Sequence, residues 1–231
     1  MDGDVQARIT GFWSRVAGGY EAHGGNVPAA GTQEYGAWVR LIGELLPPAP
    51  ADVLDAGTGT GFVATIAAGL GHRVTATDLA EPMLAQARRA GSVPAARSRL
   101  GVRFVQGDAV APAFPAASFD AVVSRHLFWT LRDPAAALAA WRRLVRPGGR
   151  VVVIDGFWFP PDAPSDPVFS SYYDEATRGS LPGWRYRDTA PIAELFEAAG
   201  FSPVTVRSLA TLYGSGAPYA ITGSTTAYDV G

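Results

Sequence analysis

The chain has 231 residues, of which 48% are hydrophobic and 17% charged, and its formal net charge at pH 7 is −2. This size and composition allow one large domain with a full core, and the charge gives no basic excess of the kind that serves nucleic-acid binding. The chain contains no cysteine, which excludes disulfides, cysteine-ligated metals and thiol nucleophiles.

The first 46 residues are expected to form a helical cap. Apolar residues recur at helical spacing from Ile9 to Val16, a glycine-rich stretch follows over 18–31, and a second amphipathic helix is predicted over 34–46. Pro47 and Pro48 end that helix.

From residue 47 to 155 the pattern alternates between strands and helices. Such alternation implies right-handed crossovers and a mostly parallel sheet. The first predicted strand ends with Val53-Leu54, and further strands are predicted over 73–77, 102–106, 119–124 and 150–155. Helices are predicted over 62–70, 81–90 and 134–145.

The remaining residues fall into two parts. Residues 156–190 are rich in proline and aromatic residues, show no clear period, and are predicted to form a small substrate lid. Residues 191–231 are expected to complete the core with a helix over 191–199 and an antiparallel pair of strands near 203–209 and 219–226.

A glycine-rich turn follows the first strand, where residues 53–61 read V-L-D-A-G-T-G-T-G. Glycine has no Cβ, so such a turn lets a ligand approach the main chain, and the helix that follows directs unpaired N–H groups toward the same point. The spacing G-x-G-x-G departs from the G-x-G-x-x-G of dinucleotide sites. An NAD-dependent oxidoreductase is therefore the less favoured alternative.

Acidic residues close the next two strands. Asp78, seventeen residues after Gly61, is placed to accept the hydroxyls of a ribose, and Asp108 to accept an adenine amine. Ser124, Arg125 and His126 end the fourth strand. All lie at carboxyl ends of parallel strands, where ligands bind in this architecture. Structural alternatives are a helix N-cap for Asp78 and a turn for Asp108.

Five motifs stand in order along the chain: V-L-D-A-G-T-G-T-G, V-T-A-T-D, Q-G-D-A, F-D-A-V-V-S-R-H and R-P-G-G-R-V-V-V-I-D. Taken together, they resemble the class I S-adenosylmethionine (SAM)-dependent methyltransferases. The resemblance covers 53–155 and is nearest to the ubiquinone and menaquinone-biosynthesis branch with the type 11 domain. It implies an α/β, Rossmann-like fold: a seven-stranded, mostly parallel sheet with an antiparallel last strand, helices on both faces and a small lid over the carboxyl edge of the strands.

The resemblance also implies the cofactor, SAM with S-adenosylhomocysteine as product, and the residues that hold it. Thr58 stands where many members of the family carry Cys, at a position that works mainly through its backbone. The residues are Asp55 and Gly57 near the methionine moiety, Gly59 and Gly61 in the turn, Asp78 at the ribose, Leu79 and Met83 beside the adenine, Asp108 and Ala109 at the adenine edge, Arg125 through its backbone, and Tyr20 at the methionine carboxylate.

The predicted reaction is methyl transfer to an oxygen, nitrogen or carbon atom of a small, ring-bearing metabolite. In-line displacement chiefly requires alignment, and a base helps where the acceptor loses a proton. His126 is the candidate base, with a structural role as the alternative. The many aromatic residues of 156–190 are suited to contact a ring-bearing substrate. The alternative is that they form a small core within the lid. The predicted substrate residues are His23, Trp129, Trp158, Tyr172 and Tyr173.

Other expectations follow from what the sequence lacks. Apolar runs are shorter than the ~18 residues of a membrane span, and the first residues, M-D-G-D-V-Q, carry no secretory signal. We expect a cytoplasmic monomer or homodimer without nucleic-acid, membrane or metal partners. A SAM-binding protein that does not methylate, such as a cyclase or a regulatory subunit, stays open because it would share the cofactor motifs.

Overall fold

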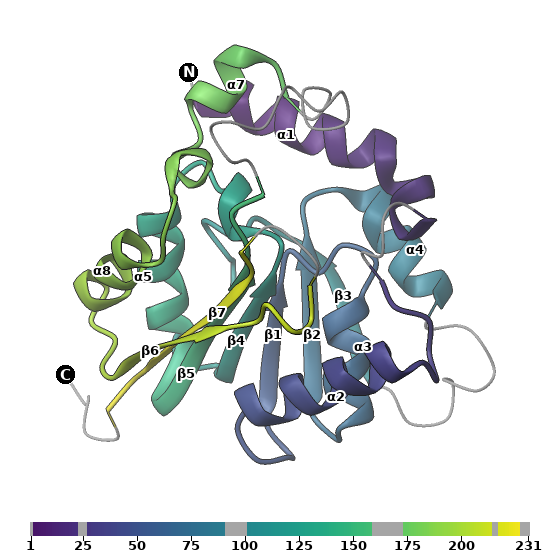
Figure 1. Cartoon of the computed structure of the whole chain (residues 1–231), viewed down its shortest axis with the longest axis vertical. Coiled ribbons are helices and arrows are strands. Elements are labelled where there is room, and N and C mark those ends of the chain that lie inside the picture. The colour runs from purple at the N-terminus through teal and green to yellow at the C-terminus, as the bar shows by residue number, and fades with distance from the viewer. Residues whose placement is uncertain (1, 23–26, 91–100, 159–172, 214–216, 227–231) are drawn as a thin grey trace.

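The computed structural model describes residues 2–22, 27–90, 101–158, 173–213 and 217–226, so the predicted substrate residues His23 and Tyr172 lie outside the described part. Within it, seven strands form one sheet in the order β3-β2-β1-β4-β5-β7-β6 (Figure 1). The strands are β1 Asp52–Ala56, β2 Arg73–Asp78, β3 Val102–Gln106, β4 Phe119–Arg125, β5 Val145–Asp155, β6 Val204–Ser208 and β7 Tyr219–Ser224.

The direction of the strands confirms the predicted fold class. Strands β1 to β5 pair in parallel, whereas β7 runs antiparallel to both of its neighbours, β5 and β6. The last strand is thus inserted between β5 and β6, and the connection from β6 to β7 lies at the carboxyl edge of the parallel strands.

Helices cover both faces of the sheet. Alternation along β1 shows why: Val53 packs with α2 and α3 on one face, and Leu54 packs with α5 and α8 on the other. The helices are α1 Asp2–Val16, η1 Ala17–Ala22, α2 Gln33–Leu45, α3 Phe62–Gly69, α4 Glu81–Ala90, η2 Phe128–Thr130, α5 Pro134–Leu144, α7 Glu175–Gly179, η3 Pro182–Arg185 and α8 Ala190–Ala198.

Local chemistry sets where two of these helices begin. The Thr32 hydroxyl accepts a hydrogen bond from the Tyr35 N–H at 3.1 Å and caps α2. Asp133 accepts one from the Ala136 N–H at 2.8 Å and caps α5, whose first residue is Pro134. Both are preferred N-cap residues, and proline suits the first helical position.

Most predicted boundaries differ from the structure by one or two residues, and two regions differ by more. Strand β5 begins at Val145 rather than at 150, because the Pro-Gly-Gly segment stays in the sheet through a register shift against β4. A Cβ at Gly149 would lie 2.5 Å from the Asp120 carbonyl oxygen, so only glycine fits there. The region predicted to lack regular structure contains α7 and η3, which are too short to show a period.

Helix α1 lies across the carboxyl edge of the sheet (Figure 1). Its Ile9 and Phe12 pack with Trp129, Tyr173 and Leu181, while Trp13 and Val16 also pack toward Ala80 and Met83. The helix is therefore attached on both sides of the edge at which the predicted site residues meet.

Candidate functional site

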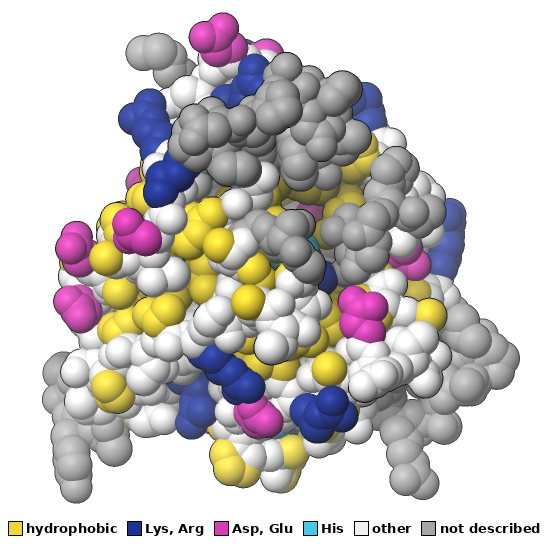
Figure 2. Space-filling view, viewed as in Figure 1, with side chains coloured by type: hydrophobic (Ala, Val, Ile, Leu, Met, Phe, Trp, Pro, Cys, Tyr) yellow, Lys and Arg dark blue, Asp and Glu magenta, His cyan; other side chains and the backbone are white. Residues whose placement is uncertain are grey.

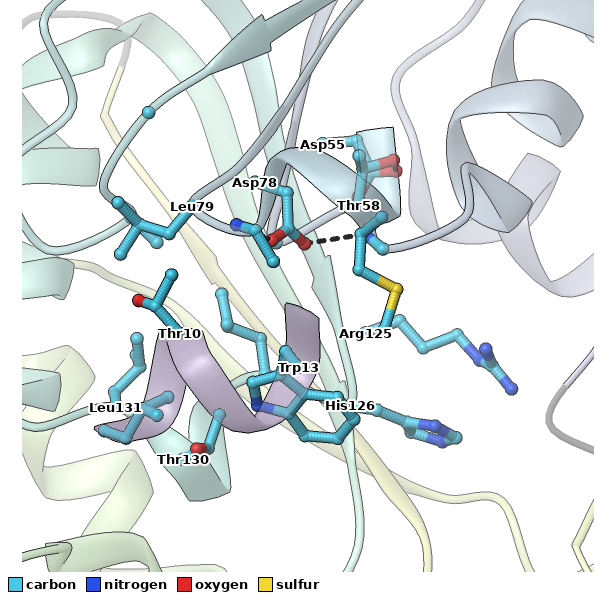
Figure 3. A pocket seen from close by; sticks show the side chains of 18 of the residues that line it. Thr10, Trp13, Asp55, Thr58, Asp78, Leu79, Arg125, His126, Thr130 and Leu131 are labelled. Carbon is cyan, nitrogen blue, oxygen red and sulfur yellow. Dashed lines mark hydrogen bonds between the residues drawn. The ribbon is translucent and has the colours of Figure 1, made fainter. Parts of the chain in front are cut away.

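A cavity with about 950 Å³ of empty space, part of it open to solvent, lies between α1 and the carboxyl ends of the strands. Its walls come from α1, the glycine turn, the ends of β2 and β4, and the segments that follow β3 and β4. In Figure 3, Thr10 and Trp13 of α1 face Asp78 and Thr58 across this space, and Arg125 and His126 lie together at one end. The strand ends singled out in the sequence thus converge on one cavity.

Asp55 fixes the shape of the glycine turn. It is only 1% exposed, and its Oδ2 accepts hydrogen bonds from the Thr58 hydroxyl at 2.6 Å and the Ala64 N–H at 3.0 Å. Burial raises the pKa of Asp55 to about 6, although these hydrogen bonds oppose the rise. Asp55 therefore ties the turn to the first turn of α3.

Asp78 faces the cavity from the end of β2. Its two oxygens accept hydrogen bonds from the Gly59 N–H at 2.9 Å and the Ala80 N–H at 2.8 Å. A carboxylate offers about four lone-pair sites, so after these bonds and a further one from the Leu79 N–H it keeps acceptor capacity for a ligand hydroxyl. Burial raises the pKa of Asp78, and the backbone N–H groups oppose this rise. Because α4 begins at Glu81, the bond to the Ala80 N–H forms a turn that precedes the helix and is not an N-cap.

The glycines of the turn make room for different neighbours. Gly59 has φ +56°, and a Cβ there would meet no heavy atom within 4 Å, so it borders open cavity. Gly57 has φ +68°, and a Cβ there would lie 2.7 Å from the Leu127 side chain. Gly61 allows α3 to approach Ala87. An open cradle at Gly59 beside the Asp78 carboxylate fits the ribose end of an adenosine ligand.

Asp108 has a cationic partner that sequence reasoning missed. Arg132 donates to its two oxygens at 2.5 and 3.3 Å, and the Val110 N–H donates at 2.8 Å. Arg132 also donates to the Gln6 side chain of α1. An adenine amine would therefore share this carboxylate with Arg132. Neither residue type nor spacing predicted this pair, because Arg132 follows η2 and lies 24 positions from Asp108.

The other predicted cofactor residues lie around the same space. Leu79, Met83, Ala109 and Tyr20 line the cavity, and the Tyr20 ring contacts Trp13 edge-on at 6.0 Å between centroids. They share the cavity wall with Asp78 and Asp108.

Arg125 contributes its side chain, which the sequence did not predict. The guanidinium lies over the rings of Trp38 and Phe62, 4.6 and 4.8 Å from their centroids, a favourable cation–π geometry. Its Nε donates to the Tyr213 hydroxyl at 3.4 Å. A fixed positive charge thus stands beside the carboxyl end of β4.

His126 is held in an uncommon conformation next to Arg125. It has φ +55°, its N–H donates to the Ile154 carbonyl at 2.9 Å, and its own carbonyl accepts from the Trp129 indole at 3.1 Å. Its Nε2 lies 2.8 Å from the Tyr213 hydroxyl. Burial, reinforced by the charge of Arg125, lowers the pKa of His126 well below 6.5. The ring is therefore neutral near pH 7, and the base role stays a prediction.

The predicted substrate aromatics form a cluster behind the cavity wall. Trp129 and Tyr173 are buried and pack with α1, with ring centroids 5.9 Å apart. Trp158 contacts the His126 ring edge-on at 4.9 Å. None of these three is among the residues that line the cavity; among the described residues they support its wall.

Asp155, at the end of β5, is a second buried carboxyl that sequence reasoning left without a role in the site. It accepts hydrogen bonds from the Trp158 indole at 2.8 Å, the Gly156 N–H at 2.9 Å and the Trp129 N–H at 3.2 Å. Burial raises its pKa to about 6. Asp155 therefore anchors both tryptophans beside His126.

The described residues form neither a membrane-spanning helix nor a cluster of metal ligands. No helix in this part of the chain is long and apolar enough to cross a membrane. In the same residues, no group of three or more His, Cys, Asp or Glu side chains is placed to hold a metal ion.

Comparison with known proteins gives a consistent result. A profile described as a methyltransferase domain matches residues 54–153. A demethylmenaquinone methyltransferase of Thermus thermophilus is 34% identical over 180 residues, which cover 71% of this chain and 80% of the relative. A nocamycin O-methyltransferase of Saccharothrix syringae is 38% identical over 144 residues, which cover 60% of this chain but only 48% of the relative.

Among solved structures, phosphoethanolamine N-methyltransferase 2 of Haemonchus contortus in complex with SAM superposes with a TM-score of 0.69. The two are 19% identical, and the match covers 92% of this chain and 57% of the other. At that identity the likeness supports the fold alone.

The sheet order, the glycine turn and the acid that ends β2 define a class I SAM-dependent methyltransferase. The chain belongs to this family, in the type 11 branch that contains the demethylmenaquinone methyltransferases. Its cofactor is SAM, which decides against the NAD-dependent oxidoreductase that the sequence left open.

Proposed function

We propose that this methyltransferase acts on a small, ring-bearing acceptor that enters the cavity beside His126. The observation that carries the proposal is the continuity of one cavity, from the Asp78 carboxylate to His126, backed by the aromatic cluster around Trp129. The two curated relatives are named for small-molecule acceptors, demethylmenaquinone and nocamycin.

At one end of the cavity, which we term the cofactor end, this chain's residues bind and orient SAM; when bound, SAM supplies a methyl group activated on its sulfonium. Asp78 accepts the ribose hydroxyls, and apolar side chains flank the adenine. The cofactor end comprises Tyr20, Asp55, Gly57, Thr58, Gly59, Gly61, Asp78, Leu79, Met83, Asp108, Ala109 and the Arg125 backbone.

At the other end, which we term the acceptor end, Arg125 and His126 line the cavity and place the acceptor, and the side chains packed behind them hold the two residues in position and exclude water. Methyl transfer chiefly requires that the acceptor atom be aligned with the methyl group. A neutral His126 can orient the acceptor without adding a charge to this end of the cavity. The acceptor end comprises the Arg125 side chain, His126, Trp129, Asp155, Trp158, Tyr173 and Tyr213.

We also propose the organisation that the sequence suggested: a cap over 1–46, a core over 47–155, a lid over 156–190, and 191–231 completing the core. The protein would act in the cytoplasm, as a monomer or homodimer, on small molecules rather than nucleic acid. In support of the last point, the described arginines on the face shown in Figure 2 are dispersed and several lie beside acidic side chains.

Two measurements test this function. Calorimetry should detect binding of SAM and of S-adenosylhomocysteine, and labelled SAM should release its methyl group to members of a panel of phenols and quinols. Absence of cofactor binding would contradict the proposal at its first step. Binding without transfer across a broad panel would instead favour a SAM-binding protein of another activity, such as a cyclase.

A further inference from the structure

Tyr213 reaches the acceptor end from the connection between β6 and β7. Its hydroxyl oxygen lies 2.8 Å from His126 Nε2 and 3.4 Å from Arg125 Nε. The three side chains form a row of hydrogen-bonding groups with Tyr213 in the middle, and the residues at its two ends, Arg125 and His126, both line the cavity.

The chemistry of the row fixes the direction of its hydrogen bonds. A guanidinium can only donate, so the Tyr213 oxygen accepts from Arg125. Burial raises the pKa of Tyr213 to about 12, and the hydroxyl therefore keeps its single proton. Among the described residues, His126 Nε2 is placed to accept the hydrogen bond that the Tyr213 hydroxyl donates.

This direction determines the tautomer of His126. A neutral imidazole has one N–H, and if Nε2 accepts, the proton is on Nδ1. The ring stays neutral near pH 7 because burial and the Arg125 charge disfavour the imidazolium. His126 thus offers Nδ1–H as a donor, and no lone pair is free to take a proton.

The backbone holds this ring in place at some cost. A left-handed φ in a residue with a Cβ costs roughly 1–2 kcal/mol, yet at His126 it is retained by the Ile154 carbonyl and the Trp129 indole. The Trp158 ring limits rotation of the imidazole. Such restraint on a residue at a cavity is typical of a functional position.

We propose that His126 is a neutral hydrogen-bond donor, through Nδ1, to an anionic or carbonyl oxygen of the acceptor, and that Tyr213 is the positioning residue that fixes this tautomer. The proposal rests on the methyltransferase function above and narrows the acceptor to molecules with a phenolate, enolate or carboxylate oxygen near the methylated atom. The Arg125 charge polarises the row toward that oxygen. The proton of an acceptor hydroxyl goes to water, not to His126.

Nuclear magnetic resonance of the full chain tests the tautomer directly. The chain has three histidines, so ¹⁵N-correlated imidazole spectra are simple, and His126→Asn assigns the signal. We expect the Nδ1–H pattern at pH 7, with no titration near 6.5. An Nε2–H pattern, or a titration near 6.5, would overturn the proposal.

Tyr213→Phe tests the positioning role. Loss of the hydroxyl should convert His126 to a mixture containing the Nε2–H tautomer. Tyr35→Phe is the matched control, since Tyr35 packs on the Phe62 ring that also lies under Arg125 and has no contact with His126 among its described interactions. An unchanged Nδ1–H signal in Tyr213→Phe would remove the role assigned to Tyr213.

A chromogenic phenol, 4-nitrophenol, tests the donor role in the presence of saturating S-adenosylhomocysteine. The bound probe should be more ionised than the free probe at the same pH, with a change in its ionisation constant on the order of tenfold. His126→Asn, whose amide N–H can replace Nδ1–H, should retain part of this effect, and His126→Gln should lose it. A bound probe less ionised than the free one would contradict the donor role of His126.

The same samples separate this inference from the proposed function. Calorimetry with S-adenosylhomocysteine reports on the cofactor end alone, so loss of binding in the wild-type chain would contradict the methyltransferase proposal. A wrong tautomer with intact cofactor binding would contradict only the role of His126 and Tyr213.

Discussion

The cofactor end and the acceptor end of the cavity are built in different ways. At the cofactor end, the Asp55 carboxylate bonds to residues three and nine positions away, so one short segment makes most of the turn. At the acceptor end, His126 meets Tyr213 from 87 positions away, and Trp129 meets Asp155 from 26. The first is a local motif on a strand end, whereas the second exists only after the whole sheet has formed.

Asp78→Ala should give the largest effect and should be confined to the cofactor end. Two charge-assisted hydrogen bonds to ribose hydroxyls contribute about 1.5–3 kcal/mol each, so affinity for S-adenosylhomocysteine should fall by about 100-fold or more. Calorimetry measures this. Exposed Glu197→Ala is the control, and unchanged affinity in Asp78→Ala would show that the ribose binds elsewhere.

Gly183→Ala should disrupt the acceptor end alone. A Cβ at Gly183 would lie 2.6 Å from Trp129 Cα and 2.7 Å from its carbonyl oxygen, backbone atoms that cannot move aside cheaply. The variant should lose about 2–3 kcal/mol of unfolding free energy while cofactor affinity stays within about threefold. Gly179→Ala is matched, because a Cβ there meets nothing within 4 Å. A large loss of cofactor affinity in Gly183→Ala would show that the two ends are coupled.

Asp155→Asn should change how stability depends on pH. The folded pKa of Asp155 is raised from 3.8 to about 6, so its protonated form favours the folded state. This contribution is complete below pH 4 and is lost as the pH rises through 6; at 1.36 kcal/mol per pKa unit it amounts to at most about 3 kcal/mol. Urea unfolding from pH 4 to 7 should show a shallower decline in Asp155→Asn, and equal slopes would contradict the raised pKa.

Arg132→Met should give the smallest effect, on cofactor affinity. The Arg132–Asp108 pair is partly exposed, with side chains 21% and 25% accessible, and pairs of this kind contribute about 1 kcal/mol or less. Affinity for S-adenosylhomocysteine should fall a few-fold, with Arg8→Met, which breaks the more exposed pair to Asp4, as the control. Tighter binding would show that Arg132 competes with the adenine for Asp108.

The cofactor end could be predicted well from the sequence, because the motifs that form it are short and local. The strand before Asp55, the glycine spacing and the acid after β2 can each be read within a few residues, and the structure places them around one cavity. Helix α4 and strand β3 begin and end at the predicted residues.

The acceptor end could not be read in this way. No sequence motif marks Tyr213, Asp155 or Arg132. Their roles depend on partners that come close only in the tertiary structure. The same holds for the Arg125 side chain, whose position depends on Trp38 in α2. Period and composition carry no signal for such pairings.

The reversed last strand has a consequence for synthesis of the protein. Because β7 is inserted between β5 and β6, the loop that carries Tyr213 reaches the carboxyl edge of β4 and β5. A ribosome makes this loop after every segment of the cofactor end. A nascent chain therefore completes its nucleoside-binding turn first and gains the partner of His126 only when nearly all of the sheet has been translated.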